Sequence, residues 1–511
     1  MKPLLFVFAL FFSANLIGQT ATPPDSTVNW GSEFPLAPGL EKNYKLVSTA
    51  PNGYQLWLYP QRAPAALLNF NHKHRLRQTR TYRAFYDRPN LRFQGFSFGL
   101  NDTLAFFEER DRRAEQQQVF VSSYKNGELG PLRPLISFDL SHNWSAVSIR
   151  SAQNYRLQDI SPLCQSPNKA LFAYVETLSP GVTNTHPRYI VTVINEAGDI
   201  LWSKEVDRTD AAEYITALDV AVTDQGEVLI LAQLHASRNY AMARGLPHIA
   251  GYRMQIFHCT ADTVIDIDIH PRQDIIPMAS RLHLPPRQGD QVMVVGMYQD
   301  NSTNHVTDGF YIKRINLAEA RYTADYYPYS RFAMNQGELV DKHWQNRMVL
   351  RDYFQFADGS FGLVAELAFP RSGPGPGGNT SYFTHQLLIP MFSPNGELLR
   401  LASLDKYLIT SDLAESSYGL GVVNDQLHIV YNERGQSLRR KFPDVDMRNK
   451  SFGTVLSTLD VNGTWAAHRL LAARNDINFD PLPRRAIFTD SFCFLPAENH
   501  KNVSIGTIAL E

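Results

Sequence analysis

Two aspartates, Asp159 and Asp219, lie in short apolar stretches, YRLQDI and TALDVAV, that are typical of β-strands. A pair of carboxyl groups on neighbouring strands can perform acid–base chemistry, because one group donates a proton while the other accepts one. The alternative is that both are ordinary charged residues beside water, with no reaction. The sequence alone leaves their separation open, and both interpretations are kept.

Four further polar residues occupy comparable stretches: Arg281 and His283 in SRLHLP, and Arg351 and Asp352 in VLRDYF. Together with the two aspartates they form one set of candidate binding residues. A second set lies in NERGQSLRRKFPDVDMRNKS (432–451), where Arg439, Arg440 and Lys441 are consecutive. This segment either grips an anionic glycan or acidic partner, or is a solvated loop, which is the usual role of such a charge run.

Recognisable signatures of cofactor chemistry are missing from the sequence. There is no Walker loop and no zinc spacing, so no cofactor is predicted. In TVIDIDIH, Asp266, Asp268 and His270 share one face, but such residues are spaced about 7 Å apart along a strand. We therefore predict no metal site there. The three cysteines, Cys164, Cys259 and Cys493, allow at most one disulfide.

The elements that position these residues are two interleaved series of hairpins. In the first series a short turn precedes an apolar run, as in PNKALFAYVE (167–176), DQGEVLILAQL (224–234) and DGSFGLVAEL (358–367). Runs without a helical period fit strands that are covered on both faces. In the second series, which includes INEAGDILWSKEV (194–206), the strand after the turn is more polar, as expected of a half-exposed outer strand.

The two series combine into a unit of four strands, A-B-C-D, that recurs roughly every 60 residues, and repetition at this scale indicates a propeller or solenoid. Over residues 44–511 the pattern resembles the β-propeller class, and it looks like the secreted, uncharacterised propellers of Gram-negative bacteria more than any enzyme family. We predict a single all-β propeller with four-stranded antiparallel blades, eight in number, with seven as the alternative. Residues 20–43 are a candidate source of a closing strand, around Val28–Leu36.

A propeller arrangement also predicts where function lies. The innermost strands line a central channel, which places the first candidate set at the channel mouth. The A–B and C–D turns are short, whereas the B–C connections are long, for example HASRNYAMARGLPHIA (235–250). All B–C connections leave one face, and binding groups concentrate on loops that a rigid frame holds. We therefore expect one decorated face.

The N-terminal residues 1–19 read as a secretory signal peptide, with Lys2 ahead of the apolar run Leu4–Phe12. No later apolar stretch is long enough to span a bilayer. The net charge of −1 gives no reason to expect nucleic-acid binding. The chain is thus predicted to be exported to the periplasm, outer surface or medium, with its oligomeric state left open.

The predicted function is a non-catalytic binding or scaffold propeller whose long B–C loops engage a protein or glycan of the cell envelope. The alternative is a polysaccharide hydrolase or lyase with acids at the channel mouth.

Overall fold

The computed structural model describes much of the chain between residues 28 and 510. The described residues are 28–31, 34–35, 44–50, 53–58, 65–82, 88, 90–99, 101–111, 114, 116–125, 128–139, 144–146, 163–180, 188–208, 214–235, 253–270, 272, 275–286, 291–300, 307–329, 348–372, 380–410, 418–434, 436–442, 452–473, 480–498 and 502–510.

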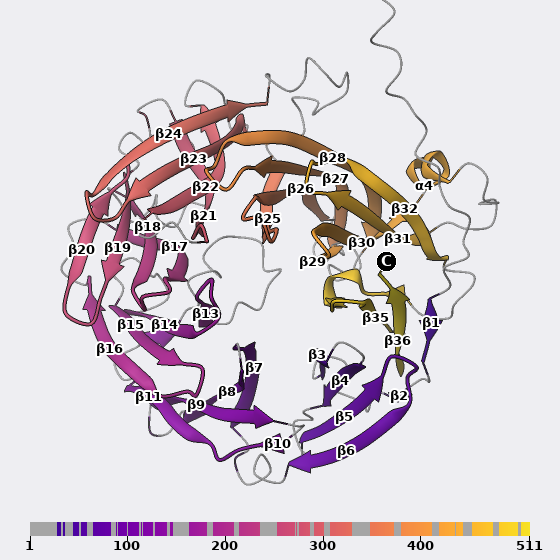
Figure 1. The fold of residues 1–511 in the computed structure, drawn as a ribbon, viewed down its shortest axis with the longest axis horizontal. Coiled ribbons are helices and arrows are strands. Elements are labelled where there is room, and N and C mark those ends of the chain that lie inside the picture. The colour runs from indigo at the N-terminus through magenta and orange to yellow at the C-terminus, as the bar shows by residue number, and fades with distance from the viewer. Residues whose placement is uncertain are drawn as a thin grey trace, which may run out of the picture.

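Within these residues the chain forms eight small antiparallel sheets arranged in a ring, so the protein is an eight-bladed β-propeller (Figure 1). The predicted fold class and the predicted number of blades are confirmed. Apart from the short helix α4 (Gln436–Lys441) and the 3₁₀ turn η5 (Pro483–Arg485), the described segments consist of strands and their turns. None of their helices is long and apolar enough to cross a membrane.

The first four sheets run in chain order from the channel outward, except where a strand is split. The first contains β3 (Tyr44–Ala50), β4 (Gly53–Leu58), β5 (Ala65–Asn71) and β6 (Leu76–Tyr82). The second contains β7 (Leu91–Phe98), β8 (Thr103–Asp111), β9 (Gln116–Lys125), β10 (Glu128–Leu129) and β11 (Arg133–Asp139). The third contains β12 (Trp144–Ala146), β13 (Leu163–Gln165), β14 (Leu171–Pro180), β15 (Arg188–Asn195) and β16 (Ile200–Asp207). The fourth contains β17 (Tyr214–Val222), β18 (Val228–His235), β19 (Arg253–Cys259) and β20 (Val264–Asp268).

The remaining sheets repeat this order. The fifth contains β21 (Ile275–His283), β22 (Gln291–Asp300), β23 (Gly309–Asn316) and β24 (Arg321–Pro328). The sixth contains β25 (Met348–Gln355), β26 (Phe361–Ser372), β27 (Thr380–Phe392) and β28 (Leu398–Thr410). The seventh contains β29 (Tyr418–Val423), β30 (Gln426–Arg434), β31 (Phe452–Asp460) and β32 (Trp465–Ala473). The eighth contains β33 (Asp480–Pro481), β34 (Ile487–Phe488), β35 (Phe492–Glu498), β36 (Asn502–Ala509), β1 (Asn29–Trp30) and β2 (Phe34–Pro35).

The eighth sheet joins the two ends of the described chain. Both β1 and β2 pair antiparallel with β36, so an N-terminal segment supplies the outermost strand of the last blade. His74, in the β5–β6 turn of the first sheet, contacts the Asn29 carbonyl at 2.5 Å and the Thr507 hydroxyl at 3.1 Å. The ring is therefore closed by backbone pairing within the eighth sheet and by side-chain contacts to the first.

Each junction between neighbouring sheets has its own hydrophobic cluster. The cluster between the third and fourth sheets, for instance, joins Val191 and Val193 to Val228 and Ile230, and each of these four side chains is fully buried. Seven comparable clusters occupy the other junctions, including the one between the first and eighth sheets. The second strand of a blade packs against both neighbours, which explains why its sequence is apolar on both faces.

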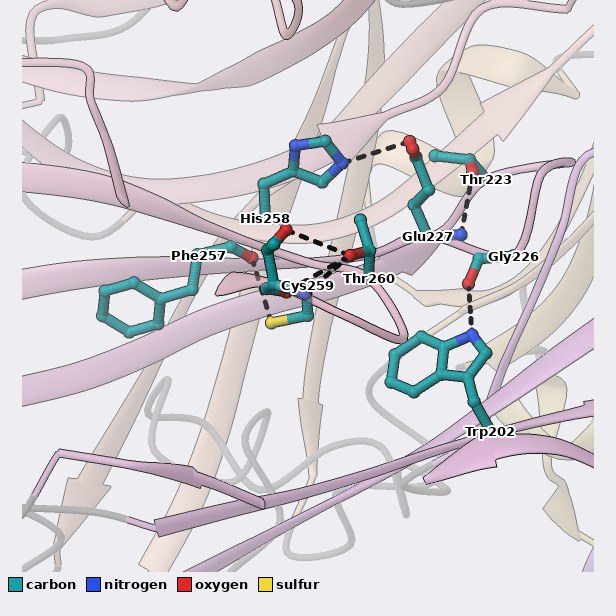
Figure 2. A network of polar contacts seen from close by, with 9 residues as sticks. Trp202, Thr223, Gly226, Glu227, Phe257, His258, Cys259 and Thr260 are labelled. Carbon is teal, nitrogen blue, oxygen red and sulfur yellow. Dashed lines mark hydrogen bonds and ion pairs between the residues drawn. The ribbon is translucent and has the colours of Figure 1, made fainter. Parts of the chain in front are cut away.

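Basic side chains reinforce the outer rim by bonding the turn of the next blade. Arg314 of the fifth sheet donates to the carbonyls of Asn395 and Gly396, in the β27–β28 turn of the sixth. Arg133, Lys204 and Arg400 make equivalent contacts to the third, fourth and seventh sheets. Figure 2 shows a related contact between the third and fourth sheets, in which the Trp202 indole donates to the Gly226 carbonyl in the β17–β18 turn at 3.0 Å.

Candidate functional site

A polar position recurs on the second strand of five consecutive sheets. In the second, fourth, fifth and sixth sheets the innermost strand has a β-bulge. The last innermost-strand residue before the bulge pairs with a residue of the second strand, and the next residue of the second strand is a Glu or a Gln. Glu176 occupies the same position in the third sheet, where β13 pairs up to Tyr174 and β12 pairs from Leu178 onward. These second-strand residues are Glu108, Glu176, Gln233, Gln299 and Glu366.

In the sixth sheet the residue at this position, Glu366, pairs with two basic side chains. The Glu366 carboxylate accepts a hydrogen bond from Lys406 Nζ at 2.6 Å and from Arg351 Nε at 2.9 Å, and all three side chains are buried. Burial by itself raises the pKa of Glu366, but the two cations outweigh it, and the net shift is downward. Glu366 is therefore a charged residue held inside the blade by a paired network.

The network continues into the seventh sheet. The Glu433 carboxylate is fully buried and pairs with Lys441 Nζ at 2.9 Å, and the same amine donates to the Tyr431 hydroxyl at 3.0 Å. Tyr418 of β29 donates to the Asp352 carboxylate at 2.7 Å across the junction. Residues predicted separately, Arg351 and Asp352 at the channel and Lys441 in the loop, are thus brought together at one junction.

The environment of Lys441 differs from the solvated loop that the sequence predicts for it. Residues 436–441 form α4, and Leu438 and Phe442 anchor this helix in the core between the sixth and seventh sheets. Lys441 points inward to Glu433, whereas Arg439 is exposed. The side chain of Arg440 lies outside the described part of the structure. Only Arg439 of this set is thus described as facing solvent.

The other predicted channel residues join neighbouring innermost strands. Asp219 of β17 is buried and accepts a hydrogen bond from the Leu282 backbone N–H at 2.9 Å, with Arg281 Nη1 at 3.6 Å from its other oxygen. His283 of β21 bonds Tyr353 of β25 and stacks on Phe361. Burial lowers the pKa of His283 to about 3, so this imidazole is neutral across the physiological range.

The proposed aspartate pair is not assembled by the described residues, because Asp159 lies outside them. The carboxylate of Asp219 contacts Leu282 and Arg281 of the fifth sheet. No group of three or more His, Cys, Asp or Glu side chains in the described part of the chain has the geometry to hold a metal ion.

A different carboxyl group has the properties of an acid–base residue. Glu176 is buried and accepts a hydrogen bond from the Tyr174 hydroxyl at 2.8 Å. Burial raises the pKa of Glu176 to about 7; the Tyr174 hydrogen bond opposes this shift, and the nearby Glu108 carboxylate of the second sheet adds to it. Glu108 in turn accepts a hydrogen bond from Gln94, the bulge residue of β7, at 2.6 Å.

Two carboxyl groups with different environments can divide the roles of proton donor and acceptor. Glu176 binds its proton up to about neutral pH, and the charge of the partly exposed Glu108 helps to raise its pKa. The sequence carried a signal for this position, since the apolar runs 104–107, 171–175 and 361–365 each end directly before a glutamate. That signal could have identified the position, although not the pKa.

The similarity of this chain to proteins of known structure is remote. No protein-family model matches the chain, and no curated protein does. Among solved structures, the β-propeller domain of the Trilobed protease from Pyrococcus furiosus is 8% identical, with a TM-score of 0.36, and the match covers 85% of this chain and 97% of that domain. Prolyl oligopeptidase B from Galerina marginata is 7% identical, with a TM-score of 0.39, over 90% of this chain and 56% of that one.

Dipeptidyl peptidase 4 from Porphyromonas gingivalis is 10% identical with a TM-score of 0.36, and the match covers 93% of this chain and 60% of the peptidase. The chain thus spans little more than half the length of these two peptidases.

Proposed function

We propose that this chain is an exported binding propeller that engages a protein or glycan of the cell envelope through the face carrying its B–C connections. The single observation that carries this proposal is the inequality of the connections. Strands β18 and β19 are separated by the residues between His235 and Arg253, and β30 and β31 by those between Arg434 and Phe452. The A–B and C–D turns, such as Val423–Gln426 and Asn195–Ile200, are tight.

Strand alternation places these connections on one side of the ring. Successive strands of an antiparallel sheet reverse direction, so the B–C and D–A connections leave one face, here called the loop face, and the A–B and C–D turns leave the other. Loops on a rigid frame are the usual carriers of recognition. Four residues that were predicted to lie at the channel mouth bond neighbouring blades: Asp219, Arg281, His283 and Asp352. These contacts favour a structural role for them and recognition elsewhere.

The test compares the two faces. A variant in which residues 236–252 are replaced by a short turn removes the β18–β19 connection of the loop face. The matched control replaces residues 284–290, between β21 and β22, on the opposite face. Both variants and the unaltered chain are assayed against a panel of envelope polysaccharides and envelope proteins, after their folding is checked by circular dichroism.

Loss of binding only in the first variant supports the proposal. Loss only in the control variant, or retention of full binding by both, contradicts this assignment of the face. Export is tested separately: the proposed signal peptide at residues 1–19 predicts a mature chain in the periplasm or medium that lacks these residues by N-terminal sequencing.

A second function, cleavage of a polysaccharide by a hydrolase or lyase reaction, is favoured by one observation: burial and the Glu108 charge raise the pKa of Glu176 to about 7. A protonated carboxyl group at neutral pH is what a general acid requires. Turnover of any polysaccharide in the panel that is abolished by Glu176→Gln and kept by Asp219→Asn would support it. Absence of turnover, with binding intact, would leave the binding function alone.

A further inference from the structure

An exposed aromatic pair lies on the outer strands of the sixth sheet. Tyr407 of β28 is 36% exposed, and its ring meets that of exposed His385 of β27 edge-on, with ring centroids 5.7 Å apart. Along this part of β28 the side chains alternate, with Asp405 and Tyr407 facing outward and Lys406 and Leu408 buried. Tyr407 is thus fixed on a rigid strand near its loop-face end.

A basic segment of the seventh sheet runs beside this strand. Arg434, the last residue of β30, donates to the Ile409 carbonyl at 3.4 Å, and Lys441 of α4 donates to the Asp405 carbonyl. These two carbonyls flank Tyr407 in β28. The segment from Arg434 to Lys441, which also carries Arg439, therefore lies along the strand that presents the tyrosine, and Figure 1 shows α4 near the end of β28.

The local charges leave this surface basic. Glu433 is the only acidic residue between positions 431 and 442, and it is buried against Lys441. Arg434 and Arg439 are exposed. The nearest outward-facing acid on β28 is Asp405, whose carboxylate accepts a hydrogen bond from Gln386. An anionic ligand would therefore be held on the arginine side of Tyr407.

The basic segment is also held in place before any ligand arrives. Leu438 is fully buried and Phe442 nearly so, and both belong to the core between the sixth and seventh sheets. A binding group on an anchored element loses less conformational entropy on binding than one on a free loop. The buried Glu433–Lys441 pair thus serves to fix α4, and Arg439 with it.

The combination points to a class of ligand. A tyrosine face offers an apolar platform on which the ring hydrogens of a sugar pack, and arginine pairs with carboxylates through two parallel hydrogen bonds. We propose that His385, Tyr407, Arg434 and Arg439 form a binding site for a polyuronate, an acidic polysaccharide with a carboxylate on each sugar. This inference rests on the proposed binding function and names its ligand class.

The experiment measures binding of the full chain to polygalacturonate, to its methyl-esterified form and to dextran by calorimetry. We expect binding of polygalacturonate only. Tyr407→Ala and the double variant Arg434→Gln/Arg439→Gln should each weaken it about tenfold, because each removes one half of the recognition. The double variant should also bind with a smaller salt dependence.

Matched controls are available on the same molecule. Leu399→Ala removes an exposed apolar side chain from the opposite end of β28, and Arg75→Gln/Arg77→Gln removes two exposed arginines from the first sheet. Both should bind within about twofold of the unaltered chain. The substituted side chains are all exposed, so thermal unfolding should be unchanged.

Retention of polygalacturonate binding by both site variants, or no binding by the folded chain, overturns the inference. Equal binding of the esterified form contradicts the role of the arginines. Binding of dextran or of an envelope protein without polygalacturonate overturns this ligand class while the general binding function survives.

Discussion

Glu176 and Glu366 occupy the same position on the second strand of their blades, yet their environments are opposite. Glu366 lies between the cations Lys406 and Arg351, and the net shift of its pKa is downward. Glu176 is also buried, but the groups that act on it are a tyrosine hydroxyl and a second carboxylate, and its pKa rises to about 7. One residue type at one repeated position is thus ionised in the sixth blade and protonated, below about pH 7, in the third.

Part of the difference arises on the outer strands. In the sixth sheet β28 carries Lys406 on its buried side, where the long side chain reaches Glu366 of the second strand. In the third sheet the lysine of the outer strand, Lys204, extends instead to the Ala261 carbonyl of the fourth sheet. A repeated fold therefore fixes where a polar side chain lies, whereas non-repeated residues of other strands decide its charge.

The largest expected effect is on the paired site. Glu366→Gln leaves Lys406 and Arg351 buried without an anion, and we expect it to lower the free energy of unfolding by about 3–5 kcal/mol. Urea unfolding followed by tryptophan fluorescence measures this. A change below about 1 kcal/mol would mean that the network contributes little, and the contrast between the two blades would then lose its basis.

Glu176→Gln should act in the opposite direction and only at high pH. The pKa of Glu176 is raised on folding, so its contribution to stability is present below pH 4.5 and is lost as the pH rises to about 7. The amide keeps an acceptor for Tyr174 and carries no charge. We expect a gain of about 2–3 kcal/mol at pH 8 and almost none at pH 4. A pH series of unfolding curves tests both values, and a stability loss at pH 8 would refute the argument.

Lys313 extends the comparison to a buried cation. Its amine donates to the Ile269 carbonyl, and burial lowers its pKa to about 7. For a lowered lysine pKa, the contribution to stability is present above pH 10.5 and is lost as the pH falls to about 7. Lys313→Met should therefore be more stable by about 2 kcal/mol at pH 6, with the gain shrinking towards pH 10. A constant difference across this range would exclude titration of Lys313 as the cause.

The smallest effect concerns the neighbour of Glu176. Glu108→Gln removes a negative charge that adds to the raised pKa of Glu176, and we expect about 0.5 kcal/mol of added stability at pH 8. The same series of unfolding curves measures it. Combined with Glu176→Gln, this gain should disappear, and full additivity of the two substitutions would show that the carboxyl groups do not interact.

The architecture could be derived from the sequence because it depends on local patterns. Turn residues and apolar runs repeat with every blade, and they fix the strand order and the number of blades. The contacts of the candidate residues could not be derived in this way. Asp219 bonds Leu282, and His283 bonds Tyr353, across more than sixty positions of sequence that carry no mark of the pairing.

The loop at 432–451 shows the same limit. Its basic residues were visible as a run, but the inward direction of Lys441 depends on Glu433 and on the packing of Leu438 and Phe442. The repeated Glu or Gln at the end of the apolar runs was visible as well. Its meaning in each blade depends on side chains of other strands, and only the structure brings these together.

The pairing of β1 and β2 with β36 has a consequence for biosynthesis. The N-terminal part of a polypeptide is synthesised first. Strand β1 (Asn29–Trp30) therefore cannot pair with β36 until residues Asn502–Ala509 have been synthesised. The other seven sheets form between strands that are close in the chain and can assemble as they appear. Completion of the circle is then the last and slowest event, since it joins the most distant partners.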